Sequence, residues 1–568
     1  MGALFSRLRL IYQTLKSISD SFSALSERIS RDPGLPIPAP SRSYWCLPHS
    51  PLDGLDSSSL PAYADIVIIG SGIAGTAIAR TLLDSSSGDK KQPLRVVMLE
   101  ARDVCSGATG RNGGHISPNS YQDYSELASK YGAEAAQAMI RFRLAHLPAL
   151  LAVAEEEGLL RESQARGVDQ LDVYLKETLF QHAKNALATY LEALPERRGK
   201  HEIYDAKTKL GALQLSPLTA GCISQAAGAL HPYRLITGIL ARLLKVYPTN
   251  FQLLTQTPCT DIVLSADGQG YRVTTPKGTL TTAHIIHATN AWAAHLLPGM
   301  RRKIVPMRVH MTAQRPGRNL GSTGTPWTGT RAFVFYPGTT MFAFDYLTQQ
   351  PNADESGSTT SGKDGKAEEG YPAPAGELMF GGGAMLGGRA EAAVLDNIGI
   401  ADDSETDFEV AAYLGGAVER YFAPGWGEES GTPTTTSSSS RESATAGGDD
   451  GWGAGRIKAA WTGIMGLSAD GQPWVGRVPQ SVSQRADPVS EANASPSLAR
   501  PGEWIAAGFT GEGMTHAWLA GAALAGMVLG DVKVEGKVKG PLPPEFLITE
   551  KRLKEADIEA FLGDAGSQ

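Results

Sequence analysis

A short apolar run that leads directly into a glycine-rich turn constrains this chain more than any other feature of its sequence. Residues 63–69 (YADIVII) are rich in β-branched side chains, which predicts a buried parallel strand. The next six residues carry glycine at the first, third and sixth positions, and residues 76–83 continue as an apolar helix. Gly70 permits the tight turn, Gly72 lets the backbone approach a pyrophosphate, and Gly75 lets the helix pack against the strand.

An acidic residue follows at the position where a dinucleotide-binding unit uses one. A second apolar run, residues 94–99, predicts a neighbouring strand that ends in Glu100, 25 residues beyond Gly75. A carboxylate at this position binds the ribose hydroxyls of a dinucleotide. The pyrophosphate then lies at the helix N-terminus, where free N–H groups and the helix dipole favour anions. Together these features predict a dinucleotide-binding domain of the α/β class.

Composition excludes several other classes of protein. The chain has 568 residues and a net charge of −7, from 52 Lys and Arg against 59 Asp and Glu, so we expect no nucleic-acid partner. Its four cysteines show no paired spacing, which excludes a disulfide framework and a CxxC metal site and fits a reducing compartment. No apolar run is long enough to predict a transmembrane helix. We expect an intracellular enzyme without a metal, in the cytoplasm, with a mitochondrial or membrane-associated location as alternatives.

The first 35 residues form a separate amphipathic segment. Apolar residues recur at alternating intervals of four and three from Leu4 to Ile29, which predicts one helix with a narrow apolar seam. Three interpretations stay open: the helix docks on its own body or on a second copy, it lies on a membrane surface, or it is a mitochondrial presequence. Residues 1–6 fit the loose N-myristoylation pattern, which favours the membrane, and the absence of acidic residues before Asp20 favours the presequence.

Two further glycine-rich segments favour FAD over a nicotinamide cofactor. Residues 101–115 form a long loop of small residues, as expected if the backbone follows an extended cofactor beyond its adenosine half. Near the other end of the chain, residues 504–507 predict a strand, 508–516 a glycine-rich turn and 517–529 a helix. The N-terminus of that helix is placed to stabilise negative charge on the pyrimidine edge of a reduced flavin.

Taken together, these motifs resemble the FAD-dependent amine and amino-acid oxidoreductases, a family that includes D-amino-acid oxidase, glycine oxidase and sarcosine oxidase. The loop 107–114 is most similar to that of the gamma-glutamylputrescine oxidases, and further landmarks of the family occur at 228–235, 283–292 and 461–476. The resemblance spans roughly residues 60–535. It implies an α/β fold (α+β overall), in which a Rossmann-like FAD-binding domain carries an inserted antiparallel-sheet substrate domain.

The resemblance also implies a reaction, the oxidation of the C–N bond of an amine or amino acid by hydride transfer to flavin N5. Oxygen is the expected acceptor by analogy with the nearest members, with hydrogen peroxide as the product, and another acceptor is the alternative. We expect non-covalent FAD, because no family-style attachment pattern for covalent flavin is present. Two other functions stay open: an FAD dehydrogenase that acts on a hydroxy acid or other small substrate with a quinone acceptor, and a non-catalytic flavoprotein scaffold.

Composition and motif order together predict how the chain is divided. Three stretches lack core-forming residues and are expected to be flexible insertions: 351–374, at the tip of a long hairpin, 427–454 and 480–500. The expected segments are an amphipathic helix (1–35), a Pro-rich connector (36–62), FAD-binding parts (63–120, 220–300 and 455–532), a helical segment with the first substrate-domain part (121–219), a second substrate-domain part (301–426) and a C-terminal tail (533–568).

The expected cofactor contacts come from the glycine motif, the acid and the two glycine-rich segments. Arg111 is assigned to the flavin rather than to a substrate carboxylate. The expected cofactor residues are Gly70, Ser71, Gly72, Ile73, Ala74, Gly75, Glu100, Ala101, Arg102, Gly107, Ala108, Thr109, Arg111, Asn112, Gly113, Gly114, His115, Gly508, Gly511, Gly513, Met514 and Thr515.

The substrate is expected between the flavin and the inserted sheet, because ligands favour domain interfaces. Several candidates also have a structural alternative. Arg308 could form a surface ion pair, and Tyr336 and Trp461 could pack in the core. His310 could face away from the cavity, because the sequence does not determine which face of a strand a given residue occupies. The candidate catalytic residues are His310, Tyr336, Trp461 and His516, and the candidate substrate-binding residues are Arg308 and Asp345.

One residue departs from the pattern that the resemblance implies. Glu512 puts a carboxylate into the loop expected near the pyrimidine edge of the flavin, where negative charge accumulates on reduction. Either its side chain points to solvent, which is the favoured interpretation, or it binds a cationic amine.

Overall fold

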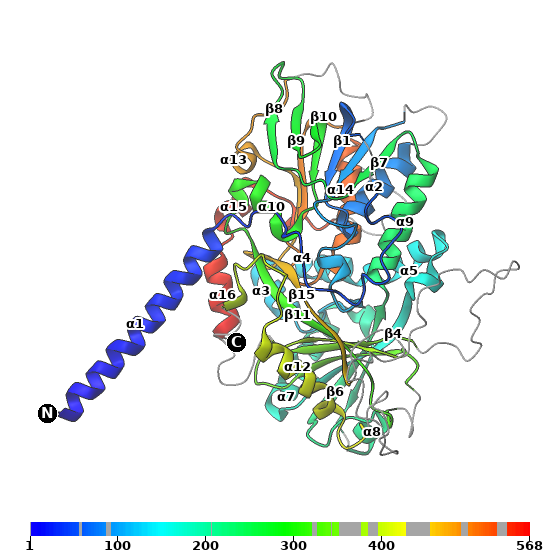
Figure 1. Cartoon of the computed structure of the whole chain (residues 1–568). Coiled ribbons are helices and arrows are strands. Elements are labelled where there is room, and N and C mark those ends of the chain that lie inside the picture. Colours follow the sequence, from blue (N-terminus) through cyan, green and yellow to red (C-terminus); the bar gives the residue numbers. More distant parts are fainter. Residues whose placement is uncertain are drawn as a thin grey trace, which may run out of the picture.

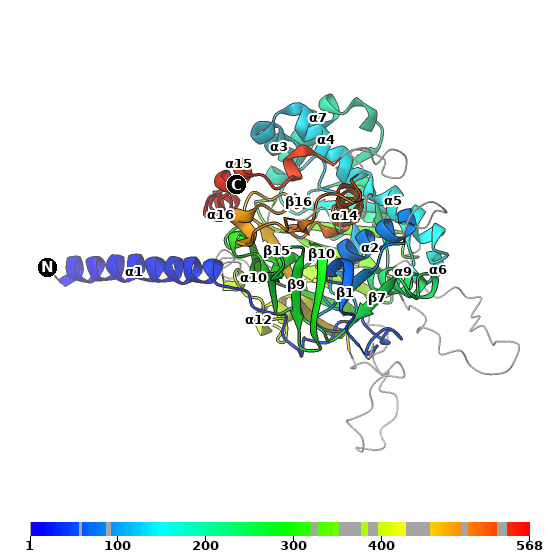
Figure 2. The same cartoon turned by 90° about the horizontal axis from the view of Figure 1, so that it is seen from above.

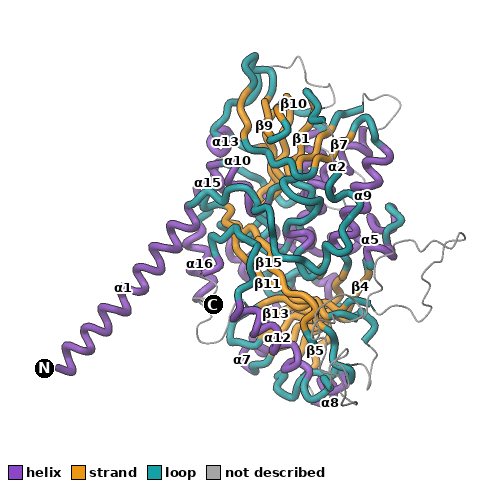
Figure 3. The backbone as a smooth tube through the Cα atoms, viewed as in Figure 1, coloured by secondary structure: helices purple, strands orange, loops and turns teal. Residues whose placement is uncertain are grey.

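The computed structural model describes residues 2–55, 59–86, 93–205, 207–320, 327–341, 344–351, 376–383, 396–427, 455–489, 498–530 and 542–567. Their strands form two sheets, one above the other in the view of Figure 1, and one long helix projects from the body. In the tube view the two groups of strands are separated by loops and helices (Figure 3). These groups correspond to the dinucleotide-binding sheet and the inserted sheet that the sequence predicts.

The first sheet has a parallel centre. Its described strands are β1 (Tyr63–Ile69), β2 (Val96–Leu99), β7 (Phe251–Leu254), β8 (Asp261–Leu264), β9 (Tyr271–Thr275), β10 (Gly278–His287), β16 (Trp474–Arg477) and β17 (Gly502–Ala507). β1 lies between β2 and β10, and β7 and β17 extend this order, all in parallel. β16 pairs antiparallel with β17, and β8 and β9 form an antiparallel extension of β10.

Side-chain alternation along β1 explains why the sheet is covered on both faces. Ile66 and Ile68 pack in the cluster formed with helices α2 (Ile73–Ser86), α9 (Pro232–Val246) and α14 (Ala517–Val528). The alternate residues Val67 and Ile69 pack in a second cluster with residues of β8, β9 and β10. The uninterrupted apolar run is therefore required, because a central parallel strand is buried on both sides. The strand and helix predictions around the glycine motif are confirmed.

The second sheet is larger and mostly antiparallel. Its described strands, in spatial order, are β15 (Ile457–Ser468), β11 (Ile304–Gln314), β14 (Leu378–Gly382), β13 (Asp345–Gln349), β12 (Arg331–Tyr336), β4 (Arg166–Tyr174), β6 (Gly221–Ala229) and β3 (His115–Ile116), with β5 (His201–Tyr204) beside β6. One pair departs from the expected antiparallel pattern, because β12 and β4 run parallel. β13 and β14 pair antiparallel, which confirms the predicted hairpin; residues 352–375 of its tip lie outside the described residues.

Three strands, β3, β6 and β15, lie in the second sheet although the expected domain boundaries put them in the FAD-binding parts. β3 pairs antiparallel with β6. β15 pairs along most of its length with β11, and β6 pairs along its whole length with β4. The sequence motifs around these strands are cofactor landmarks, but a strand joins the sheet whose edge offers it backbone partners. These strands therefore belong to the second sheet and not to the first.

Helix α12 (Phe408–Phe422) covers the face of the second sheet that points away from the first sheet. Phe333 and Phe335 of β12 pack against it, and the ring centroids of Phe335 and Tyr421 are 3.9 Å apart. The intervening residues Val334 and Tyr336 belong to the main cluster on the other face. This alternation directs Tyr336 towards the space between the sheets.

The remaining helices surround this framework or line its edges. They are α3 (Tyr124–Tyr131), α4 (Ala133–Leu144), α5 (His146–Glu156), α6 (Leu160–Ser163), α7 (Glu177–Ala193), α8 (Lys207–Ala212), α10 (Ala293–Leu296), α13 (Gln480–Ser483), α15 (Glu550–Glu555) and α16 (Ile558–Ser567).

Two segments are more ordered than their composition suggests. The expected insertion 480–500 begins with α13, where Val482 is 2% exposed, and Arg485 forms an ion pair with Glu503 of β17. Residues 490–497 lie outside the described residues. So do residues 428–454, nearly all of the expected insertion 427–454. In the expected C-terminal tail, Phe546 and Ile558 are fully buried. Composition did not predict this order, because only a few apolar residues in each segment pack against the body.

The N-terminal helix α1 (Gly2–Ser30) leaves the body almost in a straight line (Figure 2). At its C-terminal end Leu25 and Ile29 are buried against the body, while Leu10, Ile11, Tyr12, Leu15 and Phe22 are each more than half exposed. The last turns of the predicted seam thus dock on the chain's own body. No helix among the described residues is long and apolar enough to cross a membrane.

Candidate functional site

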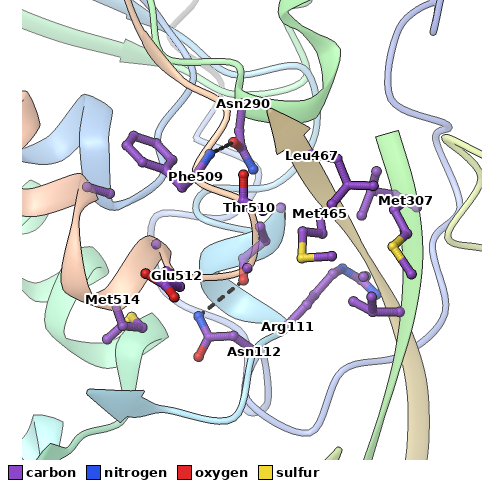
Figure 4. Close-up of a pocket in the computed structure, with 18 of the residues that line it drawn as sticks. Arg111, Asn112, Asn290, Met307, Met465, Leu467, Phe509, Thr510, Glu512 and Met514 are labelled. Carbon is purple, nitrogen blue, oxygen red and sulfur yellow. Dashed lines mark hydrogen bonds between the residues drawn. The ribbon is translucent and has the colours of Figure 1, made fainter. Parts of the chain in front are cut away.

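A cavity of about 910 Å³ lies between the two sheets. Its walls come from the β1–α2 turn, the carboxyl end of β2, the loop 101–115, the loop 508–515, and the facing sides of β11, β12 and β15. Figure 4 shows Thr510, Glu512 and Met514 on one loop, with Met465 beside Thr510 and Met307 farther along the same wall. The cavity therefore begins at the predicted dinucleotide motif and extends to the second sheet.

The β1–α2 turn has two positions where only glycine fits, Gly70 and Gly75, and one, Gly72, where a side chain would be crowded. Gly70 has a φ of +108°, and a Cβ added there would lie 2.6 Å from the Ala288 carbonyl oxygen. A Cβ on Gly72 would lie 3.0 Å from the Thr109 hydroxyl oxygen, and one on Gly75 would overlap the Gly70 carbonyl oxygen. The backbone at the start of α2 is thus bare on the cavity side, as a phosphate-binding turn requires.

Glu100 closes the same end of the cavity. Its carboxylate accepts hydrogen bonds from the Ser71 hydroxyl (2.6 Å), the Ser71 amide (3.1 Å) and the Arg102 amide (3.0 Å). These donors fix the carboxylate at the tip of β2, where it lines the cavity. The arrangement fits a residue that accepts hydrogen bonds from ribose hydroxyls.

The guanidinium groups of the loop 101–115 are held by the protein itself. Arg102 donates to both oxygens of the buried Asp403 carboxylate at 2.9 and 3.1 Å. Arg111 lies 3.5 Å from the same carboxylate and donates to the Ser41 and Thr462 carbonyl oxygens at 2.8 and 2.7 Å. Arg111 lines the cavity, but its donors join the loop to the Pro-rich connector and β15. These contacts give the guanidinium a structural role, and its assignment to the flavin stays a prediction.

A residue outside the predicted set fixes the loop 508–515. The side-chain oxygen of Asn290 accepts hydrogen bonds from the backbone amides of Gly508 (3.0 Å) and Phe509 (3.4 Å; Figure 4). Asn290 lies in the segment 283–292 that is a landmark of the family resemblance, which was the available signal. The loop then leads through a short 3₁₀ turn into α14.

Most of the predicted cofactor residues lie along the cavity. Gly75, Gly114 and Gly508 are set back from it and serve close packing instead. The predicted residues that line it are Gly70, Ser71, Gly72, Ile73, Ala74, Glu100, Ala101, Arg102, Gly107, Ala108, Thr109, Arg111, Asn112, Gly113, His115, Gly511, Gly513, Met514 and Thr515.

Comparison with known families shows which family the chain belongs to. The model of the family described as "FAD dependent oxidoreductase" matches residues 65–527. The chain belongs to this family. A search of curated protein sequences finds no significant match. The protein is an FAD-dependent oxidoreductase, and the expectation of an enzyme is confirmed.

Several solved structures share the fold at low sequence identity. Glycine oxidase from Geobacillus kaustophilus has a TM-score of 0.55 and 15% identity, with 86% of this chain and 99% of that chain covered. L-proline dehydrogenase from P. horikoshii has a TM-score of 0.56 and 17% identity, with 88% of this chain and 100% of that chain covered. L-amino acid deaminase from Proteus myxofaciens has a TM-score of 0.54 and 15% identity, with 91% of this chain and 96% of that chain covered. These similarities confirm the predicted fold class of a Rossmann-like sheet with a second, substrate-domain sheet.

The residues present fit the FAD that the family implies. Gly70 and Gly72 line the cavity without side chains, which leaves the backbone at the start of α2 open to a pyrophosphate. Along the cavity wall, the Trp292 indole nitrogen and the His115 Nε2 are buried without a hydrogen-bond partner in the described part of the chain. Burial lowers the pKa of His115 to about 3, so its imidazole is neutral. Polar atoms of this kind suit a polar cofactor.

Three of the candidate substrate-side residues lie on the cavity wall. Tyr336 stacks on Tyr174 with centroids 4.9 Å apart, which fixes its ring. Arg308 donates through Nε to the Asn397 side chain at 3.0 Å. His310 accepts a hydrogen bond at Nε2 from the Asp407 amide at 3.0 Å, so its imidazole caps the start of α12 as well as lining the cavity.

Trp461 and His516 lie behind the cavity wall and do not line it. Their catalytic roles stay predictions. Trp461 is fully buried and donates its indole N–H to the Arg111 carbonyl oxygen at 2.9 Å, so it supports the loop from behind. The Nε2 of His516 accepts from Arg143 at 3.2 Å, and its Nδ1 lies 3.0 Å from the Glu512 carbonyl oxygen. Both residues position cavity-lining loops.

Asp345 does not line the cavity, and its role in substrate binding stays a prediction. Its carboxylate accepts hydrogen bonds from the hydroxyls of Tyr413 (2.5 Å) and Tyr421 (2.6 Å) and from the Gly383 amide (2.8 Å). It points to the α12 side of β13, whereas the next residue, Tyr346, lines the cavity. Asp345 and Tyr346 therefore face opposite sides of the sheet, and sequence alone does not determine which of two successive strand residues faces the cavity.

The favoured interpretation of Glu512 as a solvent-facing residue is wrong. Its carboxylate lines the cavity and accepts a hydrogen bond from the Asn119 amide at 2.8 Å. It also lies 3.4 Å from Nε of Arg143, whose Nη1 lies 2.6 Å from Asp123. Arg143 and Asn119 were missed, because an arginine on an amphipathic helix carries no sequence signal for burial.

A second missed group lies behind Tyr336. Asp172 is fully buried and accepts hydrogen bonds from the Tyr121 hydroxyl (2.8 Å) and the side-chain amides of Gln122 (3.1 Å) and Gln170 (2.6 Å). Burial raises the pKa of Asp172 to about 6, opposed by these donors. Gln122 lines the cavity, so this network supports the substrate wall from behind.

Proposed function

We propose that this protein binds FAD non-covalently and oxidises the C–N bond of an amine or amino acid. The observation that carries the proposal is the continuity of one cavity from the glycine turn to the strands of the second sheet. A dinucleotide held at the turn leaves the rest of the volume beside β11, β12 and β15, where a small substrate can bind. The similar solved structures include a glycine oxidase, an L-proline dehydrogenase and an L-amino acid deaminase, whose names share an amino-acid substrate.

The chain contributes position and the exclusion of water. Bound FAD supplies a two-electron acceptor for the hydride that leaves the substrate carbon. Met307, Met465 and Phe509 line the cavity with apolar surface, which favours a site of low dielectric constant. Tyr336, fixed by its stack on Tyr174, forms a rigid wall that restricts the orientation of a small substrate.

Non-covalent attachment predicts that FAD leaves the protein on denaturation. We expect acid precipitation of the purified yellow protein to release its flavin into the supernatant, because no bond holds FAD once the cavity unfolds. Absorbance spectra of supernatant and pellet measure this directly. A yellow pellet after repeated washing would show a covalent link and overturn this part of the proposal.

The reaction is tested by an anaerobic titration of the FAD-loaded protein with amines, polyamines and D- and L-amino acids. We expect the flavin band near ~450 nm to bleach with one of these classes, because hydride transfer reduces the bound flavin. Hydroxy acids serve as the comparison series. Bleaching by hydroxy acids alone would assign the alternative dehydrogenase function, and no bleaching by either class would assign a scaffold.

Oxygen is the proposed acceptor, by analogy with oxidases of the family. The substrate-reduced protein from the titration is mixed with air, and the return of the flavin band is followed together with hydrogen peroxide. Reoxidation at least as fast as turnover supports an oxidase. Reoxidation slower than turnover would require another acceptor, such as a quinone.

A further inference from the structure

Glu512 is placed differently from the other acidic residues near the cavity. It lies in the loop between β17 and α14, and its side chain remains 20% exposed on the cavity side (Figure 4). The Asn119 amide holds one carboxylate oxygen at 2.8 Å, and Arg143 lies 3.4 Å from the other. Glu100, by contrast, is held by donors at the opposite end of the cavity.

The charges around Glu512 do not balance. Arg143 of α4 is the basic partner, and it faces two carboxylates, those of Asp123 at 2.6 Å and Glu512 at 3.4 Å. His516, which also contacts Arg143, adds no positive charge, because burial lowers its pKa well below the usual value. Glu126 of α3 adds further negative potential at the guanidinium. One carboxylate charge is therefore in excess on this wall.

A carboxylate in this position lacks a full counter-charge. Burial raises the pKa of Glu512 to about 7, and the Asp123 charge adds to the increase while Arg143 opposes it. Removing a carboxylate from water is costly unless a cation and hydrogen-bond donors compensate. The Arg143 guanidinium also bonds to Asp123, His516 and the Asn119 carbonyl oxygen, so it shares its one charge between the two carboxylates. A ligand cation in the cavity would supply the second charge.

We propose that the Glu512 carboxylate binds the protonated nitrogen of the incoming amine, so that this cavity selects cationic amines. The nitrogen gives this proton to the Glu512 carboxylate before the neighbouring carbon loses a hydride. The inference rests on the proposed function, because it assigns a substrate group to the same cavity. An ammonium group offers N–H donors and the positive charge that the wall lacks. Glu512 is then a substrate-binding residue, and Arg143 and Asn119 position it.

The test uses ligands that bind but cannot react. tert-Butylammonium has no hydrogen on the carbon attached to nitrogen, and pivalate has the same apolar group with the opposite charge. Binding of each is measured on oxidised, FAD-loaded protein by the perturbation of the flavin spectrum at about pH 8.5. Because no turnover is needed, the result can be read even if no amine reduces the flavin, which separates this test from that of the proposed function.

We expect Glu512→Gln to weaken tert-butylammonium binding by about tenfold or more, because it removes a charge-assisted hydrogen bond. Pivalate binding stays unchanged or becomes tighter. The variant leaves the Arg143–Asp123 pair intact, so the guanidinium keeps one counter-charge and the fold is retained. Glu134→Gln, on the exposed side of α4, is the matched control and leaves both ligands unaffected. Asn119→Ala, which frees the carboxylate, gives a smaller loss in the same direction.

The pH dependence gives a readout that a merely structural role would not change. Glu512 is charged above its pKa of about 7 and neutral below it. In the wild type, tert-butylammonium binding therefore weakens from about pH 8.5 to about pH 5.5, a range over which the ligand keeps its charge. The dependence is lost in Glu512→Gln, although Asp123, Arg143, Glu126 and His516 still face the site. Unchanged tert-butylammonium binding in Glu512→Gln, or equal losses for both ligands, would overturn the proposal.

Discussion

Gly70→Ala is expected to yield a protein that is purified largely without FAD. The backbone at Gly70 has a φ of +108°, and an added Cβ would lie 2.6 Å from the Ala288 carbonyl oxygen. Neither neighbour can move alone, because residues 66–69 of β1 pair with the strand that leads into Ala288. The strain and the displaced turn are expected to weaken FAD binding by roughly 10- to 100-fold. The ratio of flavin to protein absorbance, and calorimetric titration of apoprotein with FAD, measure the loss.

A second glycine separates the effect of strain from that of the cavity. Gly132, in the turn between α3 and α4, has a φ of +89°, and a Cβ added there would have no atom within 4 Å. Gly132→Ala therefore adds backbone strain that costs about 1 kcal/mol of stability or more, but it should retain its FAD. Equal FAD contents in the two variants would show that the β1–α2 turn does not hold the cofactor.

Asp403→Asn is expected to cause the largest loss of stability among single substitutions near the cavity. The Asp403 side chain is fully buried and is the shared counter-ion of Arg102 and Arg111. Removing its charge leaves two buried guanidinium groups without an anion, which costs about 3–5 kcal/mol. We expect a lower unfolding temperature and an earlier release of FAD, because both arginines organise the loop 101–115. Thermal unfolding with tryptophan and flavin fluorescence as separate probes measures both effects.

The adjacent aspartate provides a matched control. Asp402 is exposed and accepts hydrogen bonds from the backbone and side chain of Ser404. Asp402→Asn changes the same functional group one residue away and is expected to shift stability by no more than about 0.5 kcal/mol. A comparable loss in both variants would contradict the role assigned to the buried pair.

Local sequence patterns were sufficient for the elements around the cofactor. The run 63–69 became β1, the glycine turn led into α2, and Glu100 came to lie at the tip of β2. The strand 504–507 and the helix after it were also predicted nearly to the residue, as β17 and α14. These predictions succeeded because backbone conformation, apolar periodicity and close approach are set by neighbours in the chain.

The side-chain assignments on the second sheet were less successful, because they depend on which face of a strand each residue occupies. Tyr336 faces the cavity because Phe333 and Phe335 of the same strand pack against α12. Asp345 faces α12 because Tyr346 takes the cavity side. Alternation along each strand was visible in the sequence, but which face meets the cavity depends on helices far away in the chain.

The sequence by itself determined the dinucleotide-binding unit, the family and the presence of a second sheet. The tertiary structure decided which sheet β6 and β15 join, because strand pairing depends on partners distant in the chain. It also decided the charge around Glu512, which is set by Arg143 and Asp123 from a separate part of the chain. Backbone form is a local property, whereas the burial and pairing of a charge depend on every element that surrounds it.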